Sequence, residues 1–281
     1  MAITRTRIAD DLRSLGVRRG DLLMIHSSLR SLGAVDGGAP TVVDALLEVL
    51  GTEGTLVGPA FTFASASSPD FVFDPGATPS EMGAVAEEIR CRPGAMRSTH
   101  ALHSLSAVGP YADTIIRSGD ASAWDRASPL AKVFDLDGRF LLLGVTYQSF
   151  TAVHVLEIEF GTQYRTPSSL VRRLRCSDGS ETKLVSTMYP RVHDYPGYDF
   201  NRLGQAMEDE GIVSVGGVGN AMARLVPGLQ MQEFAAAQIA IDPDYLYRQG
   251  MNVLSLTSGF TLDMPRGAIS VVDPTRVYNP P

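Results

Sequence analysis

The sequence predicts an α/β protein with one main body and a smaller, strand-rich lobe. Hydrophobic patterns of helices and strands alternate from residue 4 to about residue 162, as in a parallel sheet with right-handed crossovers. Two loosely alternating segments then flank a turn sequence between about residues 163 and 198. A chain of 281 residues with 44% hydrophobic residues can bury one large core. We therefore expect a single domain over residues 1–281, with the lobe inserted in the main body.

The first helix and strand units follow each other closely. Residues 4–15 carry apolar residues at helical spacing, and residues 21–26 then have the pattern of a buried strand. The next helix is expected to begin at Pro40, because proline suits the first helical turn, and to end at Gly51. A further strand is expected at residues 55–59, which completes a strand, helix, strand unit.

A capping box predicts another helix beginning at Pro79. Thr78 can cap the helix, Glu81 stands at its third position, and Arg92-Pro93-Gly94 would end it. The remaining elements of the main body up to residue 162 are expected to be a strand at 105–109, a helix beginning at Ser128-Pro129, and a central strand at 139–145.

The lobe is predicted to be an antiparallel hairpin. Residues 169–175 and 182–189 alternate around Ser177-Asp178-Gly179-Ser180, which is a turn sequence. Beyond it we expect a helix from Asp199 to Gly211, a strand at 212–215, and a glycine turn at 216–219 leading into a helix that ends near Ile241. The glycine spacing is not that of a dinucleotide-binding fingerprint, so a tight turn is expected rather than a phosphate site.

Composition narrows the classes of function. The formal net charge is −7, which argues against nucleic acid as the main partner and suits a cationic ligand. With two cysteines, Cys91 and Cys176, and no apolar core in the first residues, we expect a reduced, cytoplasmic protein. No apolar stretch is long enough for a membrane span, and with only Lys132 and Lys183 the sequence has no Walker loop.

A histidine and a carboxylate follow the strand expected at residues 139–145. His154 and Glu157 are three residues apart, so on a helix they share one face. A helix beginning at Ser149 or Thr151 would place His154 near its positive end, which disfavours imidazolium, while Glu157 favours it. Ligands in open α/β sheets bind beyond the carboxyl ends of strands. The pair therefore predicts a general base with its orienting partner, the alternative being two side chains that merely decorate an amphipathic helix.

Two other groups of residues leave alternatives open. Cys91 could be a nucleophile assisted by His100 or His103, or a plain structural thiol. The same two histidines, with His26 and His193 elsewhere, could supply zinc ligands, but no cysteine or acidic ligand stands near them, so we expect no metal. The sequence Gly-x-Ser-x-Gly of a hydrolase nucleophile elbow is absent.

The acceptor-facing candidates are also ambiguous. Trp124 and Asp125 could line a pocket or be ordinary half-buried residues. Asp194 and Asp199 stand among aromatic residues, a composition that binds ammonium groups but also occurs in solvated loops.

Many ordered blocks of this sequence resemble the aminoglycoside 3-N-acetyltransferase family, over most of residues 8–160 and more weakly at 217–225. The blocks are His26-Ser27-Ser28-Leu29 with Gly33 and Gly37-Gly38; Gly54-Thr55-Leu56 with Pro59 to Phe63; Phe73-Asp74-Pro75 with Thr78-Pro79-Ser80 and Met82-Gly83; Pro93-Gly94 with Arg97, Ser98 and His100; His103-Ser104 with Ala107-Val108-Gly109; Ser128-Pro129; and Leu141 to Gly144 ahead of Thr151, His154 and Glu157. The resemblance implies a three-layer α/β/α sandwich with a mixed central sheet and a smaller appended antiparallel lobe, unlike the Gcn5-type acetyltransferases.

The resemblance also implies the reaction. Acetyl-CoA would donate an acetyl group to the 3-amino group of a 2-deoxystreptamine aminoglycoside, which gives antibiotic resistance. The expected partners are coenzyme A and a cationic small-molecule amine, without nucleic acid, membrane or metal, and a homodimer stays open. The alternatives are a related acetyltransferase acting on another small amine and a nonenzymatic binding module.

Residue roles carry over only where the motifs match. His154 matches the family's catalytic histidine and Glu157 its partner. The positions that match the coenzyme A site are Ser27, Ser28, Leu29, Ser98, His100, Ser104, Leu105 and Ser106. This sequence departs from the family at His100-Ala101, where His-Pro is usual, and at Trp124 to Ala127, where a glycine-rich approach to Ser128 is usual.

The expected mechanism is direct transfer without an acyl-enzyme. His154 would take a proton from the acceptor amine as it attacks the thioester. Thr62, or backbone amides near Ser27 to Leu29, would stabilise the oxyanion. The residues expected against the acceptor are Phe63, Asp125, Asp194 and Glu208.

Overall fold

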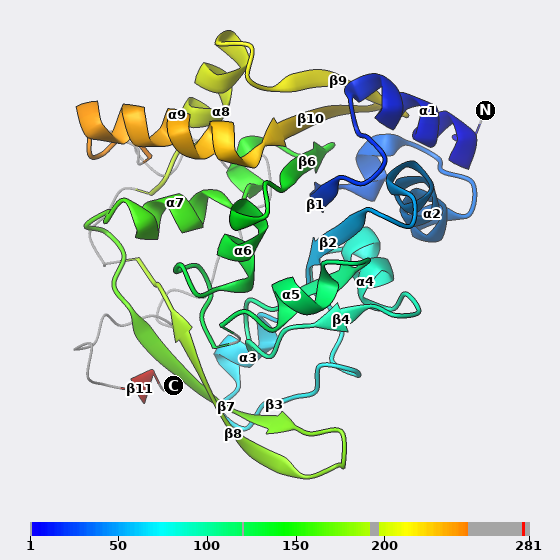
Figure 1. Cartoon of the computed structure of the whole chain (residues 1–281). Helices are drawn as coiled ribbons and strands as arrows, with labels where there is room; N and C mark the ends of the chain where they lie inside the picture. Colours follow the sequence, from blue (N-terminus) through cyan, green and yellow to red (C-terminus); the bar gives the residue numbers. More distant parts are fainter. Residues whose placement is uncertain (1, 120, 192–196, 247–276, 279–281) are drawn as a thin grey trace.

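A seven-stranded mixed sheet in the order β4-β5-β2-β1-β6-β10-β9 forms the centre of the molecule (Figure 1). The computed structural model describes residues 2–119, 121–191, 197–246 and 277–278. β1 (Leu22–Ser27) pairs in parallel with both β2 (Thr55–Pro59) and β6 (Arg139–Leu143). The antiparallel pairs are β2 with β5 (Leu105–Val108), β5 with β4 (Met96–Arg97), β6 with β10 (Ala221–Pro227) and β10 with β9 (Ser214–Val218). The carboxyl ends of β1 and β6 therefore meet at one edge of the sheet.

Alternating side chains on the central strands divide the core into two halves. In β6, Phe140 and Leu142 belong to one buried cluster, and Leu141 and Leu143 to the other. This period of two is that of a strand buried on both faces. Helices α1 (Arg5–Leu15), α2 (Gly38–Leu50) and α4 (Ala84–Arg90) cover one face, and α5 (Ala112–Ile116), α6 (Pro129–Asp135), α7 (Val153–Glu159), α8 (Phe200–Asp209) and α9 (Gly228–Ile241) cover the other (Figure 1). The predicted three-layer sandwich is confirmed.

The smaller lobe is built on the predicted antiparallel hairpin. β7 (Ser168–Arg175) and β8 (Glu181–Met188) pair along their whole length around the expected turn. Two short strands, β3 (Val72–Phe73) and β11 (Val277–Tyr278), add to β7 in parallel. Arg172 on β7 is buried, and its Nε donates over 2.5 Å to the carbonyl of Ser65, which lies in α3 (Ala64–Ser67). This contact fastens the lobe to the main body beside the residues that follow β2.

The prediction that a helix begins at Pro79 is wrong. α4 begins at Ala84, because Gly83 has a φ of 91°, which a right-handed helix does not allow. The supposed capping residues serve other parts of the chain: the Thr78 hydroxyl accepts from the amide of Asp74, and the Glu81 carboxylate accepts from the amide of Ala64.

The glycine turn expected at 216–219 is also wrong, and with it the start of the last helix. Gly216 and Gly217 lie within β9, and residues 221–227 form β10, which pairs with the central strand β6. The helix begins only at Gly228. The helix expected from Pro40 begins two residues earlier, at Gly38.

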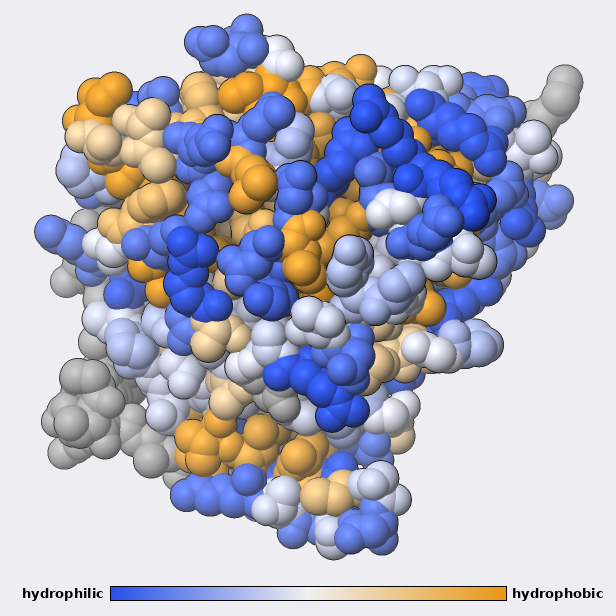
Figure 2. Space-filling model, viewed as in Figure 1, coloured by the Kyte–Doolittle hydropathy of each residue, from blue (hydrophilic) through white to orange (hydrophobic). Residues whose placement is uncertain are grey.

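The outer surface is strongly polar over α1 (Figure 2). Arg13 on this helix pairs with Asp10 and with Glu48 of α2, both at the surface. Among the described helices, none is both long enough and apolar enough to cross a membrane.

Candidate active site

His154 is the second residue of α7, which follows β6 through the short helix η2 (Tyr147–Ser149). The prediction that it lies in the first helical turn is confirmed, although Ser149 and Thr151 do not cap the helix. The hydroxyl of Thr151 instead lies 2.6 Å from Nε2 of His26, near the end of β1. His154 therefore lies beyond the carboxyl ends of two parallel strands, where α/β proteins bind ligands.

The imidazole of His154 and the carboxylate of Glu157 form the predicted pair. Nδ1 of His154 lies 2.6 Å from Oε2 of Glu157, whose side chain is fully buried. The other carboxylate oxygen, Oε1, accepts from the hydroxyl of Tyr164 over 2.5 Å. Nε of Arg165 donates to Oε2. Both oxygens of Glu157 are thus held by buried donors.

Glu157 is ionised and fixes the tautomer of His154. Burial alone would raise the pKa of Glu157, but Arg165, His154 and Tyr164 together lower it to about 2. A carboxylate only accepts hydrogen bonds, so the proton of the short contact belongs to Nδ1 of His154. The lone pair is then on Nε2, to which no described residue hydrogen-bonds.

The ring of His154 is uncharged at neutral pH. Burial, and then the charge of Arg165, lower its pKa to about 4 against the opposing effect of Glu157. A neutral imidazole with one nitrogen oriented and the other unpartnered is the form that a general base needs.

Aromatic rings surround His154. The centroid of the Trp124 ring lies 4.3 Å from that of His154, and the Trp124 ring also lies 4.7 Å from His103. Tyr198 and Phe200 meet His154 edge-on at centroid distances of 5.6 and 5.2 Å. His154 exposes 7% of its surface in this arrangement, and the indole nitrogen of Trp124 has no partner in the described part of the chain. Trp124 thus contacts the imidazole directly.

Two surface hollows lie away from this ring. One is lined by Pro75, Gly76, Arg90, Cys91, Ala95 and Arg97, and the other by Pro69, Asp70, Val171, Arg172, Arg173, Glu181, Thr182 and Lys183. Neither hollow is lined by His154, by Glu157 or by the aromatic residues that contact His154.

The Ser27, Ser28 and Leu29 loop lies at the end of β1 and is partly buried. The amide of Ser28 donates to the carbonyl of Leu143 over 2.9 Å, so it is not available to an oxyanion. The Ser28 hydroxyl accepts from Ser31. That this loop contacts coenzyme A stays a prediction.

The other residues expected at coenzyme A are more deeply placed. They expose at most 2% of their surface and comprise Ser98, His100, Ser104, Leu105 and Ser106. Nδ1 of His100 accepts from the amides of Leu102 and His103, and its Nε2 lies 3.1 Å from the carbonyl of Thr187. The Ser98 hydroxyl accepts from the amide of Leu105. These bonds support the loop from within, and direct contact of its residues with the coenzyme stays a prediction.

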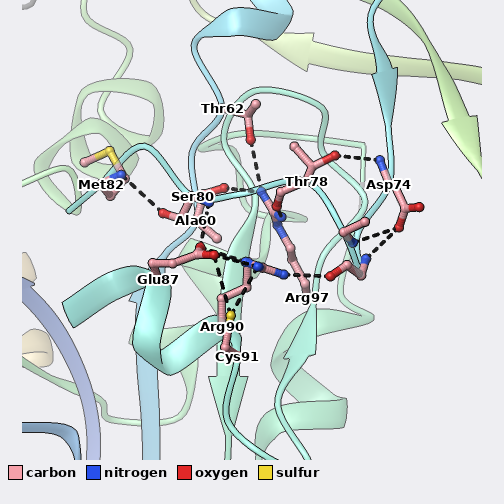
Figure 3. A network of polar contacts seen from close by, with 12 residues as sticks. Ala60, Thr62, Asp74, Thr78, Ser80, Met82, Glu87, Arg90, Cys91 and Arg97 are labelled. Atoms are coloured by element: carbon pink, nitrogen blue, oxygen red, sulfur yellow. Dashed lines mark hydrogen bonds and ion pairs between the residues drawn. The ribbon is translucent and has the colours of Figure 1, made fainter. Parts of the chain in front are cut away.

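Thr62 is held by the partly buried Arg97 (Figure 3). Arg97 donates to the Thr62 hydroxyl over 3.0 Å and to the carbonyls of Ala60 and Thr78. Its Nε also donates to the Ser104 hydroxyl over 3.0 Å. Because the Thr62 oxygen accepts from Arg97, its own proton can be donated elsewhere.

The expected acceptor-binding carboxylates are already engaged. Asp125 accepts from the hydroxyl of Tyr189 over 2.8 Å, and Glu208 accepts from Tyr147 and Arg224 over 2.9 and 2.6 Å. Phe63 packs edge-on against Phe61, with 6.3 Å between centroids. Asp194 and His193 lie outside the described residues.

The alternative role of Cys91 as a nucleophile finds little support. The Cys91 thiol is exposed beside Arg90 and Glu87 (Figure 3), and partial burial raises its pKa, which opposes a nucleophilic role. In the described ranges no group of three His, Cys, Asp or Glu side chains is placed to hold a metal ion.

Sequence reasoning did not single out Tyr164 and Arg165. They follow Glu157 by seven and eight residues, outside the helix, so no periodic pattern connects them to it. Only the path of the chain back from α7 towards β7 brings them to the carboxylate.

Comparisons with known proteins show the family to which this chain belongs. The pattern of the family described as aminoglycoside 3-N-acetyltransferase matches residues 24–240. Aminoglycoside N(3)-acetyltransferase IV of Salmonella sp. is 31% identical over 242 residues, which cover 85% of this chain and 88% of that protein. The structure of AAC-VIa bound to sisomicin is similar, with a TM-score of 0.76 at 26% identity, covering 86% of this chain and 98% of that one.

A second solved structure shows the same fold. AAC-IIIb, solved as a binary complex with CoASH, has a TM-score of 0.77 at 21% identity, and the match covers 90% of this chain and all of that one. The region matched by the family pattern includes His154, Glu157 and Arg165. The chain belongs to the aminoglycoside 3-N-acetyltransferase family and is an acyltransferase.

Proposed function

We propose that the protein transfers the acetyl group of acetyl-CoA to the 3-amino group of a 2-deoxystreptamine aminoglycoside, with His154 as general base. Family membership supports the donor and the acceptor class, and the related AAC-VIa binds sisomicin. The use of acetyl-CoA and the two free cysteines support a cytoplasmic enzyme.

One observation carries the proposal: Nδ1 of His154 lies 2.6 Å from Oε2 of the buried Glu157, and no described residue hydrogen-bonds to Nε2. The amine nitrogen attacks the thioester carbonyl, and Nε2 removes a proton from that nitrogen as the C–N bond forms. The C–S bond then breaks and coenzyme A leaves as the thiolate, which can take up the proton. Glu157 stabilises the imidazolium in between, as the acidic member of a triad does.

Thr62 is our proposed donor to the oxyanion. Arg97 orients its hydroxyl through a bond of 3.0 Å and leaves the hydroxyl proton for another acceptor. Such a fixed donor is effective because no reorganisation is needed when the charge develops. Leu29 follows Ser28 in the neighbouring loop, and its amide is the remaining backbone candidate.

A second acceptor class is favoured by one feature of the site. Asp125 and Glu208, proposed to bind the ammonium groups of an aminoglycoside, already accept hydrogen bonds from protein donors. An amine with fewer positive charges would not need to displace these donors. A related reaction on another small amine is therefore the alternative.

A thiol-release assay separates these two acceptor classes. Purified protein is given acetyl-CoA with sisomicin, gentamicin, neomycin, apramycin or a simple monoamine. Release of coenzyme A with one or more aminoglycosides, together with acetylation at the 3-amino group by mass spectrometry and NMR, is the expected result. Turnover with the monoamine alone would overturn the aminoglycoside assignment and leave the acetyltransferase activity in place.

A further inference from the structure

Arg165 lies between the His154–Glu157 pair and the lobe. Its side chain is almost fully buried, at 4% exposure, and its Nε donates to Oε2 of Glu157. A second nitrogen, Nη1, donates to the carbonyl of Tyr189 over 2.8 Å, just beyond β8. The third, Nη2, lies 3.1 Å from Nδ1 of His154.

The chain positions this guanidinium through the base of the hairpin. Arg165 forms an isolated antiparallel bridge with Arg191, and the amide of Thr166 donates to the carbonyl of Pro190 over 3.3 Å. The residues before β7 and after β8 are thus paired, and the side chain of Arg165 projects from this pairing to Glu157.

The charge of Arg165 opposes protonation of His154. A buried carboxylate beside an imidazole normally favours the imidazolium. Here the same carboxylate is neutralised by Arg165, so a proton on Nε2 would create a second cation within hydrogen-bond distance of the first. Burial and Arg165 indeed lower the pKa of His154, and Glu157 only partly offsets them.

The other charged groups near His154 have weaker effects. Arg191 also lowers the pKa of His154, but it is an exposed side chain and is screened by solvent. His26 and His103 have pKa values lowered chiefly by burial, His26 to about 4, and are uncharged at neutral pH. Tyr198 presents only an aromatic edge.

We propose that Arg165 is a positioning residue that fixes the orientation of Glu157 and holds the imidazole of His154 in its neutral form from the base of the lobe. The inference rests on the proposed role of His154 as base. It assigns a function in the reaction to a residue that acts through Glu157 and His154.

The test compares Arg165→Gln with Arg165→Lys and with Arg191→Gln as the matched control. The titration of His154 is followed by NMR on histidine-labelled protein, with His154→Ala used to assign its signal, and kcat/KM is measured from pH 5.5 to 9. Arg165→Gln should raise the pKa of His154 by at least about one unit, which is roughly a tenfold change in the protonation equilibrium. When the kcat/KM profile is extended down to pH 4, its acid limb should lie at least about one pH unit higher than that of the wild type.

In Arg165→Lys the acid limb of kcat/KM should lie where it does in the wild type, because the positive charge remains. The plateau rate should be lower, because lysine lacks the guanidinium group that orients Glu157. Arg191→Gln should change neither by more than about a factor of two, as is usual for an exposed, screened charge. An unchanged His154 titration in Arg165→Gln would overturn the inference. If Arg165→Gln does not fold, Arg165→Lys provides the test. An acid limb of kcat/KM shifted to higher pH, or a plateau rate equal to that of the wild type, would contradict the proposal.

A wrong base and a wrong role for Arg165 would give different results. If Arg165→Gln shifts the His154 titration while His154→Ala keeps wild-type turnover, the role of Arg165 in holding the ring neutral stands and the proposed base is wrong. If His154→Ala loses turnover but the titration is unmoved by Arg165→Gln, only the inference on Arg165 is wrong.

Discussion

Nε2 of His26 lies 2.6 Å from the hydroxyl oxygen of Thr151, joining the end of β1 to the loop that leads into α7. The two residues are 125 positions apart in the sequence. The carbonyl of Thr151 also accepts from the amide of His154 over 3.0 Å. The position of the candidate base therefore depends on a contact between the end of β1 and the loop that leads into α7.

Replacing Thr151 by valine should destabilise the fold and slow turnover. The change leaves Nε2 of the buried His26 without a partner, and an unpaired buried group costs about 1–3 kcal/mol. Thr151→Ser keeps the hydroxyl and is the matched control. Urea unfolding of both variants measures the difference, and equal stability of the two would contradict this role for the contact.

Replacing Glu157 by glutamine should slow turnover without abolishing it. Glutamine keeps the shape but removes the charge that fixes the tautomer of His154 and stabilises its protonated form. We expect a smaller loss than for removal of His154 itself, together with a fall in stability of about 3–5 kcal/mol because the buried Arg165 loses its anion. Chemical denaturation and the thiol-release assay test both effects; a stable, fully active Glu157→Gln enzyme would rule the arrangement out.

Arg97 should matter more for stability than an exposed arginine. Arg97→Lys retains the charge but cannot reach Thr62, Ser104 and the two carbonyls at once, and each buried acceptor left unpaired costs about 1–3 kcal/mol. Arg19→Lys, at an exposed pair with Glu53, should stay within about 0.5 kcal/mol. Equal denaturant midpoints of the two variants would contradict this contribution of the Arg97 hydrogen bonds to stability.

Stability should fall as the pH is lowered from about 6.5 to 4. Burial lowers the pKa values of His26, His100 and His154 from 6.5 to about 4 in the folded protein. In that interval the unfolded chain binds more protons than the folded one, so the free energy of unfolding decreases with acidification. Glu157, with its pKa lowered to about 2, adds a further loss below its ordinary pKa of 4.5. Thermal unfolding between pH 7.5 and 4 measures this, and a flat Tm across that range would be the contrary result.

The sequence predicted correctly those elements whose hydrophobic periodicity and order along the chain indicate the same structure. The β1 and β6 strands and the helix carrying His154 follow from buried apolar runs and their succession. The helix expected at Pro79 failed because a local capping pattern does not reveal that Thr78 and Glu81 bond to Asp74 and Ala64 instead.

The same limit applies to β10 and to the active site. β10 was missed because its strand character comes from pairing with β6, a contact far away in the sequence. The pair of His154 and Glu157 is local and was predicted from spacing. Tyr164 and Arg165 reach that pair, and His26 reaches Thr151, only through the tertiary path of the chain, which spacing along the sequence does not contain.

The central claim is that His154 accepts the proton of the attacking amine, and the turnover of His154→Ala tests it most directly. Thiol release with acetyl-CoA and sisomicin should fall by about 100- to 10,000-fold, the usual contribution of a general base. Binding of acetyl-CoA, followed by its stabilising effect on Tm, should be close to that of the wild type. Wild-type turnover in a folded His154→Ala enzyme would contradict the account.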